Sequence, residues 1–420
     1  MNQTHTNIFL HSLAPSALKL SAKNRVDDVA LYQSQLNQSS ERALLLAENR
    51  DYIILNHYPD RDYLDYLIDM DIGTRKILIP KNKGLSLSEN VLGDEQLLKR
   101  LKTLGTKIVL HPYISTETEA KIAKVIGATV NGSPPDLTAK VNSKIYIPTL
   151  LQALALPIPE YEIANAARVI NTAEKFINQY DKIIVIGNHT YGGLAVWAIT
   201  NEKTFNTFKL DISQSPPDEK FLVEKMYNVV CSPNIQFQIY PDAIQILGIT
   251  EQILDDKLVY HGNQYPLLTK QLDKIRQDSF RICEKLQLEG YRGLLGIDFI
   301  ETIEGKIFAV DINGRANSST FGLEVIRKLF PDSYANKKHF KILSHISIEK
   351  KANFVELTNI IGKENIFYKQ TGRGIFPYNT GFLQWGKFSA IVIANTWEEI
   401  NQLLETWKKI TSPPVAQPHG

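Results

Sequence analysis

Three polar side chains with cation- and phosphate-binding chemistry stand two residues apart in the stretch KIFAVDINGRANSST, which runs from Lys306 to Thr320. Asp311, Asn313 and Arg315 would all lie on one face of a strand, because successive side chains of a strand alternate between its two faces. Carboxylate and amide oxygens are ligands of hard divalent cations. A guanidinium binds phosphoryl or carboxylate groups through paired hydrogen bonds. The spacing therefore predicts a site for a cation and an anion at the end of a strand.

A second carboxylate is expected to face Asp311 across a β-hairpin. The stretch GLLGIDFIETIEGKIFAVDIN (293–313) holds two alternating apolar runs around Glu-Gly at 304–305, and glycine suits the second position of a tight hairpin turn. A two-residue turn there places Asp298 opposite Asp311 by symmetry. The other face of this hairpin is predicted to lie in the core, with Leu295, Ile297, Phe299, Phe308, Val310 and Ile312.

The two opposed carboxylates predict a metal site. Like charges that face each other on a sheet repel, and burial raises the pKa of such a pair unless a cation lies beside it. Mg²⁺ is commonly held by one or two carboxylates together with phosphate oxygens of a substrate. Asp298, Asp311 and Asn313 are therefore interpreted as an open site for Mg²⁺, or for Mn²⁺ in its place. The alternative is a solvated sheet edge at which Arg315 pairs with one of the acids.

Length and composition narrow the class of protein. A chain of 420 residues exceeds one ordinary core, so two to four domains or subdomains are expected. A net charge of +2 disfavours a dedicated nucleic-acid binder, and no apolar run is long enough to cross a bilayer. The first 20 residues lack the basic start of a secretory signal, and Cys231 and Cys283 form no CxxC pattern. These features predict a cytoplasmic protein with both cysteines in its core.

Strands and helices alternate in the first third of the chain. Residues 51–58, 75–80 and 106–113 are rich in β-formers, and helical stretches separate or follow them, which favours a parallel sheet covered by helices. The turn-rich run NGSPPDL (131–137) marks a domain boundary.

Beyond that boundary the pattern changes to antiparallel strands. Helices are predicted at 144–154, 166–180 and within 267–288, a strand–glycine loop–strand unit at 181–199, and strands at 221–227, 235–241 and 243–250. The tail from residue 346 holds a strand and an amphipathic helix, so a small α+β unit is expected there.

The hairpin resembles the metal-binding end of the ATP-grasp superfamily, whose members carry an acid on one strand and an acid-x-Asn-x-Arg run on the next. The matching residues are Asp298 and the run from Asp311 to Arg315. Many members have glutamate where Asp311 stands, and aspartate is one methylene shorter.

A lysine upstream extends the resemblance. Family members often carry a phosphate-contacting lysine about three helical turns before a Gly-x-Pro-x-Pro-like corner. KIYIPTLLQALALPIPE supplies Lys144 and the corner, with Ala155 where glycine is frequent. The alternatives are a plain surface lysine at 144, and Lys140 in the same role.

The adenine-binding hinge of the family resembles the stretch FLVEKMYN. Its acid, basic and apolar residues are Glu224, Lys225 and Met226. The resemblance implies that backbone groups around Lys225 and Met226 read the adenine edge and that Glu224 lies near it. The alternative is an ordinary strand with a solvated Glu-Lys pair.

The glycine loop NHTYGGLA resembles the flap that covers the phosphates in the family. Gly192 and Gly193 allow amides to approach anionic oxygens closely. Many members carry a second phosphate-binding lysine at the end of the strand before this loop, whereas this sequence has Ile186 near that point. His189 is the candidate donor that partly replaces it.

The resemblance implies a fold and a domain division. It implies a Rossmann-like pre-ATP-grasp domain at 1–133, an ATP-grasp domain of two subdomains at 134–345 with a hinge near 221–228, and a small C-terminal α+β domain at 346–420. The ordered motifs cover residues 134–330.

The function that the resemblance implies is an ATP-dependent carboxylate–amine ligase. ATP would phosphorylate a substrate carboxylate, and an amine would displace phosphate from the acylphosphate to form an amide, with ADP and phosphate released. Arg315 would be catalytic, and it would bind substrate with Asn317, Ser318 and Ser319. The expected partners are a small carboxylate such as an amino acid or peptide, an amine, and a second copy of the chain, without nucleic acid or membrane. The alternatives are a phosphotransferase on the same fold and a nucleotide-binding protein that has lost catalysis.

Overall fold

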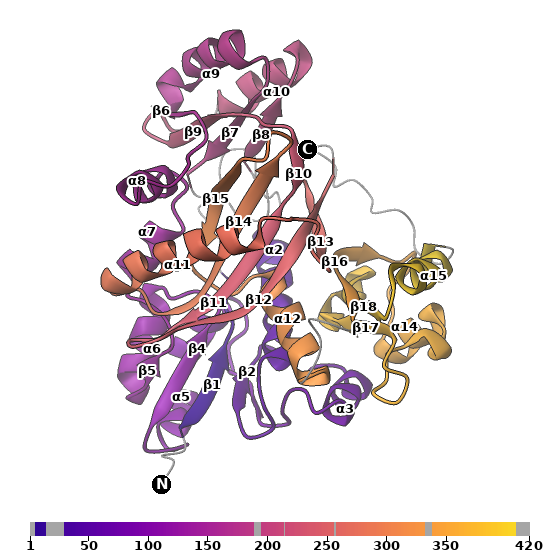
Figure 1. The fold of residues 1–420 in the computed structure, drawn as a ribbon. Helices are drawn as coiled ribbons and strands as arrows, with labels where there is room; N and C mark the ends of the chain where they lie inside the picture. Colours follow the sequence, from indigo (N-terminus) through magenta and orange to yellow (C-terminus); the bar gives the residue numbers. More distant parts are fainter. Residues whose placement is uncertain are drawn as a thin grey trace.

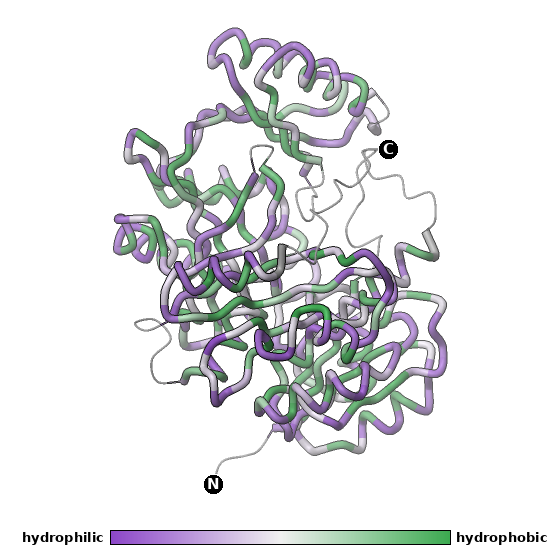
Figure 2. Tube along the Cα trace, turned by 90° about the vertical axis from the view of Figure 1, so that its right-hand side faces the viewer, coloured by the Kyte–Doolittle hydropathy of each residue, from purple (hydrophilic) through white to green (hydrophobic). Residues whose placement is uncertain are grey.

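The computed structural model describes residues 5–13, 29–188, 195–213, 215–255, 258–331 and 338–408. Three β-sheets organise these residues, and helices cover their faces (Figure 1). Along the helices, hydrophilic and hydrophobic residues alternate, as expected of helices that cover a sheet with one face (Figure 2). Within the described ranges, no helix combines the length and the apolar character needed to span a bilayer.

The N-terminal sheet is parallel, in the order β3-β2-β1-β4-β5. Its strands are β1 (Thr6–Leu10), β2 (Tyr52–Ile54), β3 (Ile77–Leu78), β4 (Ile108–Pro112) and β5 (Thr129–Val130). The helical elements between them are α2 (Val29–Gln38), η2 (Ser39–Leu45), α3 (Arg61–Asp69), α4 (Leu87–Leu92), α5 (Glu95–Lys102) and α6 (Glu117–Ile126). This architecture confirms the predicted α/β N-terminal domain, although the central strand β1 was not among the predicted strands.

A small antiparallel sheet follows, in the order β6-β9-β7-β8. Its strands are β6 (Tyr161–Asn165), β7 (Ile183–Gly187), β8 (Val196–Ile199) and β9 (Lys220–Lys225). Helices α9 (Ala166–Tyr180) and α10 (Glu202–Ile212) pack on one face, against Val185, Phe221 and Val223 among others (Figure 1). The other face is turned towards the hairpin and is called the cleft face below.

The large sheet is antiparallel and carries the predicted hairpin. In order, its strands are β10 (Val229–Cys231), β14 (Gly293–Thr302), β11 (Pro233–Ile239), β12 (Ile244–Leu254), β13 (Tyr260–Tyr265), β16 (His339–Ser347), β18 (Lys387–Ala394) and β17 (Gly374–Tyr378), and β15 (Ile307–Asn313) pairs with β14. Helix α11 (Leu272–Leu288) covers one face and buries Cys283, and α12 (Ser318–Leu329) packs on the opposite face. Cys231 is also buried, and both cysteines are free thiols.

The C-terminal segment joins this sheet rather than forming a sheet of its own. Strand β16 spans the predicted boundary at residue 345, and it pairs with both β13 and β18. The remaining C-terminal elements are α14 (Phe354–Ile361), η3 (Lys363–Asn365), η4 (Thr380–Trp385) and α15 (Trp397–Lys408). One apolar core joins α14, η4 and α15 to α3, η2 and α12. The three-domain division stays a prediction.

A buried carboxyl group joins the N-terminal element η2 to the C-terminal element η4 and makes the stability of the fold depend on pH. Glu41 in η2 accepts hydrogen bonds from the backbone N–H and hydroxyl of Thr380 (2.7 and 3.0 Å) and from the N–H of Gly381 (3.2 Å). Burial raises its pKa from 4.5 to about 7, although these hydrogen bonds act in the opposite direction. Because the pKa is higher in the folded state, stability from this group is present at low pH and is lost as pH rises from 4.5 through 7.

We expect Glu41→Gln, which keeps an acceptor oxygen but does not ionise, to remove this loss. The free energy of unfolding of the variant should gain about 2 kcal/mol on wild type between pH 5 and pH 8. Denaturant unfolding at both pH values measures the difference, with the exposed Glu95→Gln as control. Parallel pH profiles for wild type and Glu41→Gln would contradict the prediction.

Candidate active site

The hairpin of β14 and β15 places Asp298 directly opposite Asp311, as the sequence predicts. Its turn is one residue longer than the expected two-residue turn. The N–H of Thr302 donates to the carbonyl of Lys306 at 2.9 Å, and Gly305 completes the loop with a φ of +76°. A β-bulge on β15 then restores the register before the acids meet.

The bulge changes which side chains of β15 face the core. Phe299 pairs with Ala309 rather than with residue 310, so Ile307 and Ala309 join the core beneath α11. Val310 is therefore not on the predicted core face, and Phe308, although it is buried as predicted, lies on the opposite face, because the extra residue inverts the alternation before the bulge. Phe308 instead packs against the hinge residue Tyr227, with 5.0 Å between ring centroids.

The two carboxylates lie in a buried, polar setting. Asp298 is 8% exposed, and burial followed by the charge of Asp311 raises its pKa to about 7. Asn234 on β11 donates a hydrogen bond to Asp298, and Gln236 donates to the oxygen of Asn234 at 2.7 Å. Thr320 at the start of α12 donates to Gln236 at 2.8 Å. This chain of hydrogen bonds holds Asp298 in place from the neighbouring strand.

Asn313 ends β15, and Arg315 lies in the bend that follows, so the site extends beyond the predicted strand. The amide nitrogen of Asn313 lies 3.2 Å from Asp298 Oδ2 and 3.3 Å from Asp311 Oδ2, so the three side chains converge. Arg315 Nη2 donates to Asn313 Oδ1 at 2.7 Å, and its Nη1 donates to Tyr113 Oη at 3.1 Å. Tyr113 directly follows β4, so Arg315 lies where the N-terminal sheet meets the hairpin.

Lys144 reaches the same site from the other direction. Its ammonium group forms an ion pair with Asp311, and its side chain is 11% exposed. The competing candidate Lys140 is turned away, because it pairs with Glu289 at 2.8 Å and lies over the ring of Tyr146. The interpretation of residue 144 as a plain surface lysine is therefore wrong.

Two asparagines hold Lys144 in place, and neither belongs to the motifs recognised in the sequence. Asn142 ends α7 (Pro135–Val141), and its Oδ1 accepts the N–H of Gly314 at 3.1 Å. Asn188 follows β7, and its backbone carbonyl accepts the N–H of Lys144 at 3.1 Å. Its side-chain oxygen accepts Ser143 Oγ at 2.6 Å. The segment before α8 (Tyr146–Ala153) is thus held by the hairpin on one side and by the small sheet on the other.

We expect Asn142→Ala to lower kcat/KM about tenfold, because the loss of the Gly314 contact releases Lys144 from its position. Steady-state ADP release measures the effect. Lys140→Ala, two residues away and paired outside the site, is the matched control and should keep wild-type activity. Equal activity of Asn142→Ala and wild type would overturn the positioning role.

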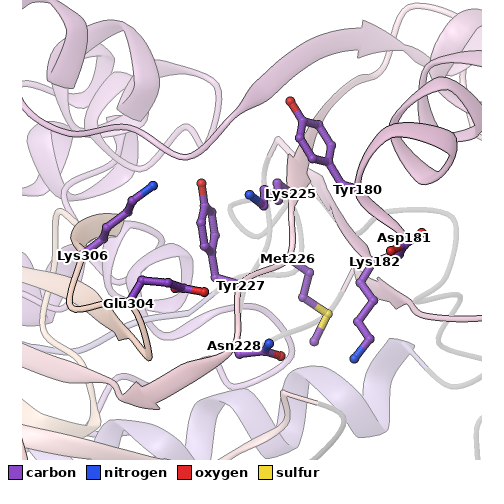
Figure 3. Close-up of a pocket in the computed structure, with 9 residues that line it drawn as sticks. All are labelled: Tyr180, Asp181, Lys182, Lys225, Met226, Tyr227, Asn228, Glu304 and Lys306. Atoms are coloured by element: carbon purple, nitrogen blue, oxygen red, sulfur yellow. The ribbon is translucent and has the colours of Figure 1, made fainter.

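At the hinge, the side chains of Glu224 and Lys225 point to opposite faces of β9. Glu224 lies on the cleft face of β9, is 7% exposed, and has a pKa raised to about 7 by burial. Within the described part of the chain, no hydrogen bond to its carboxyl group is found. Lys225 alternates to the opposite face and lies between the rings of Tyr180 and Tyr227, at 5.3 and 4.7 Å from their centroids (Figure 3).

Lys225 and Met226 line a cavity of about 340 Å³ on the outer side of this hinge (Figure 3). The N–H of Met226 donates to the carbonyl of Lys182 at 3.1 Å, so this amide is already used. The alternative interpretation, a solvated Glu-Lys pair, is wrong, because Glu224 is buried and Lys225 lies over two tyrosine rings. Hydrogen bonding of the adenine edge by backbone groups near Lys225 stays a prediction.

The end of β7 carries no cation. Ile186 lies on the cleft face, opposite Leu222. His189, Gly192 and Gly193, which were predicted to contact phosphates, lie outside the described residues.

The candidate substrate residues after Arg315 have structural partners. Asn317 is the N-cap of α12 and accepts the N–H of Thr320 at 3.1 Å. Ser319 is buried, and its hydroxyl accepts a hydrogen bond from Thr250 at 3.3 Å. Ser318 is partly exposed. Substrate binding by these three residues stays a prediction.

The donor set fits a divalent cation that also has phosphate ligands. Burial and the nearby charge of Asp311 raise the pKa of Asp298, so a cation between the two carboxylates would stabilise the ionised form of Asp298. Within the ranges that the structure describes, no group of three His, Cys, Asp or Glu side chains is placed to hold a metal ion. Asn313 now turns its nitrogen to the acids and its oxygen to Arg315, and a turn of the amide would present a third oxygen.

Sequence comparison identifies two family models in the chain. Residues 159–313 match the family described as L-aspartate–L-methionine ligase, ATP grasp, which spans the small sheet, the hinge and the hairpin. Residues 40–128 match the pre-ATP-grasp domain. A curated relative, the [butirosin acyl-carrier protein]–L-glutamate ligase of Niallia circulans, is 23% identical over 296 residues, which are 69% of this chain and 67% of that protein.

Solved structures share the fold over nearly the full length. The L-amino acid ligase of Bacillus licheniformis superposes with a TM-score of 0.56 and 10% identity, covering 98% of both chains. The ADP complex of N5-carboxyaminoimidazole synthetase from Staphylococcus aureus gives a TM-score of 0.58 at 11% identity, covering 97% of this chain and 98% of that one. Residues 159–313 carry an ATP-grasp domain and residues 40–128 a pre-ATP-grasp domain in front of it, and the protein is an ATP-dependent ligase that forms C–N bonds.

Proposed function

We propose that this ligase joins the carboxyl group of an amino acid or short peptide to an amine through an acylphosphate. The observation that carries the proposal is the convergence of Asp298, Asp311, Asn313 and Lys144 on one point, with Arg315 beside them at the edge of the N-terminal domain. Amino acids are named as substrates for the matched family, for the curated relative and for the structural neighbour.

The nucleotide is proposed to lie between the cleft face of the small sheet and the hairpin. The carboxyl of Glu224, for which the described residues show no hydrogen bond, would accept a hydrogen bond from the adenine amino group at the hinge end. Lys144 would move from Asp311 to the β- and γ-phosphates when these arrive. Mg²⁺ bound by Asp298 and Asp311 would neutralise charge on the phosphates.

The proposed reaction has two steps. A carboxylate oxygen of the first substrate attacks the γ-phosphorus, the bond to the bridging oxygen breaks, and ADP leaves. The amine of the second substrate then attacks the acyl carbon, the bond to the phosphate oxygen breaks, and the ammonium loses a proton. Arg315, which donates to Tyr113 and Asn313, would bind the transferred phosphoryl group or the acyl oxygen through its guanidinium.

A screen with ATP and Mg²⁺ tests the proposal. Amino acids are added singly and in pairs, beginning with L-aspartate, L-methionine and L-glutamate, and mass spectrometry detects a product equal to two inputs minus one water. Hydroxylamine in place of the amine should trap the acylphosphate as a hydroxamate. ADP release that needs a hydroxyl acceptor instead of a carboxylate would indicate a phosphotransferase. Saturable ATP binding without ADP from any pair would indicate a protein that only binds nucleotide.

A further inference from the structure

The cleft face of the small sheet is apolar between its two ends. Phe221 and Val223 point to the helices, so the alternating residues Lys220, Leu222 and Glu224 point to the cleft. Their partners on β7 continue this face, because Leu222 pairs with Ile186 and Glu224 pairs with Ile184. Among the described residues of β7 and β9, Lys220 is thus the single cation on the cleft face.

The two charged residues of this face lie at opposite ends. Glu224 is at the hinge, and Lys220 is four residues away, which is about 13 Å along an antiparallel strand. A nucleotide with its base at Glu224 and its chain extended along β9 would bring its phosphates to Lys220. A triphosphate carries several negative charges, so a second ammonium group would strengthen its binding beyond what Lys144 and the proposed Mg²⁺ supply.

Backbone hydrogen bonds place Lys220 beside the Lys144 segment. The N–H of Asn188 donates to the carbonyl of Lys220 at 3.0 Å, and the carbonyl of Asn188 accepts the N–H of Lys144 at 3.1 Å. Lys220, Asn188 and Lys144 therefore stand on three adjacent stretches of backbone. Lys144 extends from there to Asp311 in the hairpin, so Lys220 lies at the same end of the cleft as the carboxylates.

The side chain of Lys220 is exposed, and no acid among the described residues forms an ion pair with it. Two other lysines of the same subdomain are engaged elsewhere. Lys175 pairs with Glu162 at 2.6 Å, and Lys209 lies over the ring of Phe205. The ammonium group of Lys220 is available for a ligand in the cleft.

We propose that Lys220 is the second phosphate-binding cation of this protein and that it contacts the β- or γ-phosphate of ATP together with Lys144. The proposal rests on the proposed function only in placing the nucleotide between the two sheets. In this proposal the positive charge comes from Lys220 on β9, because β7 carries the uncharged Ile186 where a lysine is expected. Since Lys220 is diagonal to Ile186 on the same face, the two side chains start about 7 Å apart and reach the same region.

Calorimetric binding of ATP and AMP to single variants tests this role. Lys220→Ala should raise the Kd for ATP about tenfold and leave the Kd for AMP unchanged, because AMP lacks the outer phosphates. Lys209→Ala, on the far side of the same subdomain, is the matched control for the loss of one positive charge. An unchanged Kd for ATP, or equal weakening of ATP and AMP, would overturn the proposal.

A double variant separates charge from local structure. Lys220→Ala with Ile186→Lys returns an ammonium group to the same face from the neighbouring strand, and it should recover most of the ATP affinity. Failure of a folded double variant to recover affinity would count against a role through charge. These measurements need no second substrate and no turnover, so a failed ligase assay would leave their outcome readable.

Discussion

Asp311→Asn is expected to lower ADP release at least about a thousandfold while the protein stays folded. The substitution keeps the size of the side chain but removes the charge that faces Asp298 across the hairpin. It also removes the ion partner of Lys144, whose side chain is 11% exposed. A site built to neutralise phosphate charge would lose one of two carboxylates, and such electrostatic contributions are among the largest in phosphoryl transfer.

The measurement is turnover with the amino acids found in the screen, together with circular dichroism and thermal unfolding. Asp273→Asn, an exposed acid in the first turn of α11, is the control and should behave as wild type. Mg²⁺ should raise the unfolding temperature of the wild type in the presence of ADP and have a smaller effect on Asp311→Asn. A folded Asp311→Asn variant with wild-type turnover would refute the assignment of the metal site.

Local patterns predict the hairpin well because the residues that determine its pairing lie within some twenty positions of the sequence. Alternation and a glycine turn suffice to bring Asp298 opposite Asp311. The predicted turn is one residue too short, and the bulge at Val310 compensates for it. Asp298 and Asp311 therefore pair as predicted, whereas Phe308, between the turn and the bulge, lies on the other face. Bulges next to functional sites re-aim side chains in this way, and no composition signal marks this one.

The alternation of side chains along β9 also predicts the arrangement of the hinge, which the family motif alone does not indicate. Adjacent residues of a strand point to opposite faces, so Glu224 and Lys225 cannot both point into the cleft. Lys225 instead lies between two tyrosine rings on the outer side. The corner after α8 is different, because Ala155 takes a φ of +48°, the left-handed conformation expected where glycine is frequent.

The residues that hold the site together could not be predicted from local patterns. Asn142 contacts Gly314 across 172 positions, Arg315 contacts Tyr113 across 202, and Asn234 contacts Asp298 across 64. Such partners depend on how the sheets pack, and a single asparagine or tyrosine has many ordinary uses. The alternation of Asn234, Gln236 and Gln238 along a buried strand was the one visible signal, because polar side chains seldom line a core face without partners.

Arg315→Lys is expected to lower turnover about a hundredfold with little change in ATP affinity. Lysine keeps the positive charge but loses the planar fork that donates to Asn313 and Tyr113 at the same time. A group that binds the transferred phosphoryl acts in the transition state more than in the ground state, so kcat should fall while the Kd for ATP changes less than about threefold.

Hydroxamate trapping separates this role from a purely structural one. If Arg315 stabilises formation of the acylphosphate, the hydroxamate yield should fall in parallel with turnover in Arg315→Lys. Tyr113→Phe keeps the aromatic ring beside the guanidinium but removes the hydroxyl that accepts Nη1 at 3.1 Å, so its loss should be milder, about fivefold. Should Arg315→Lys weaken ATP binding as much as turnover, the guanidinium would serve to assemble the junction of the two domains, and the chemistry at the acyl group would belong to other residues.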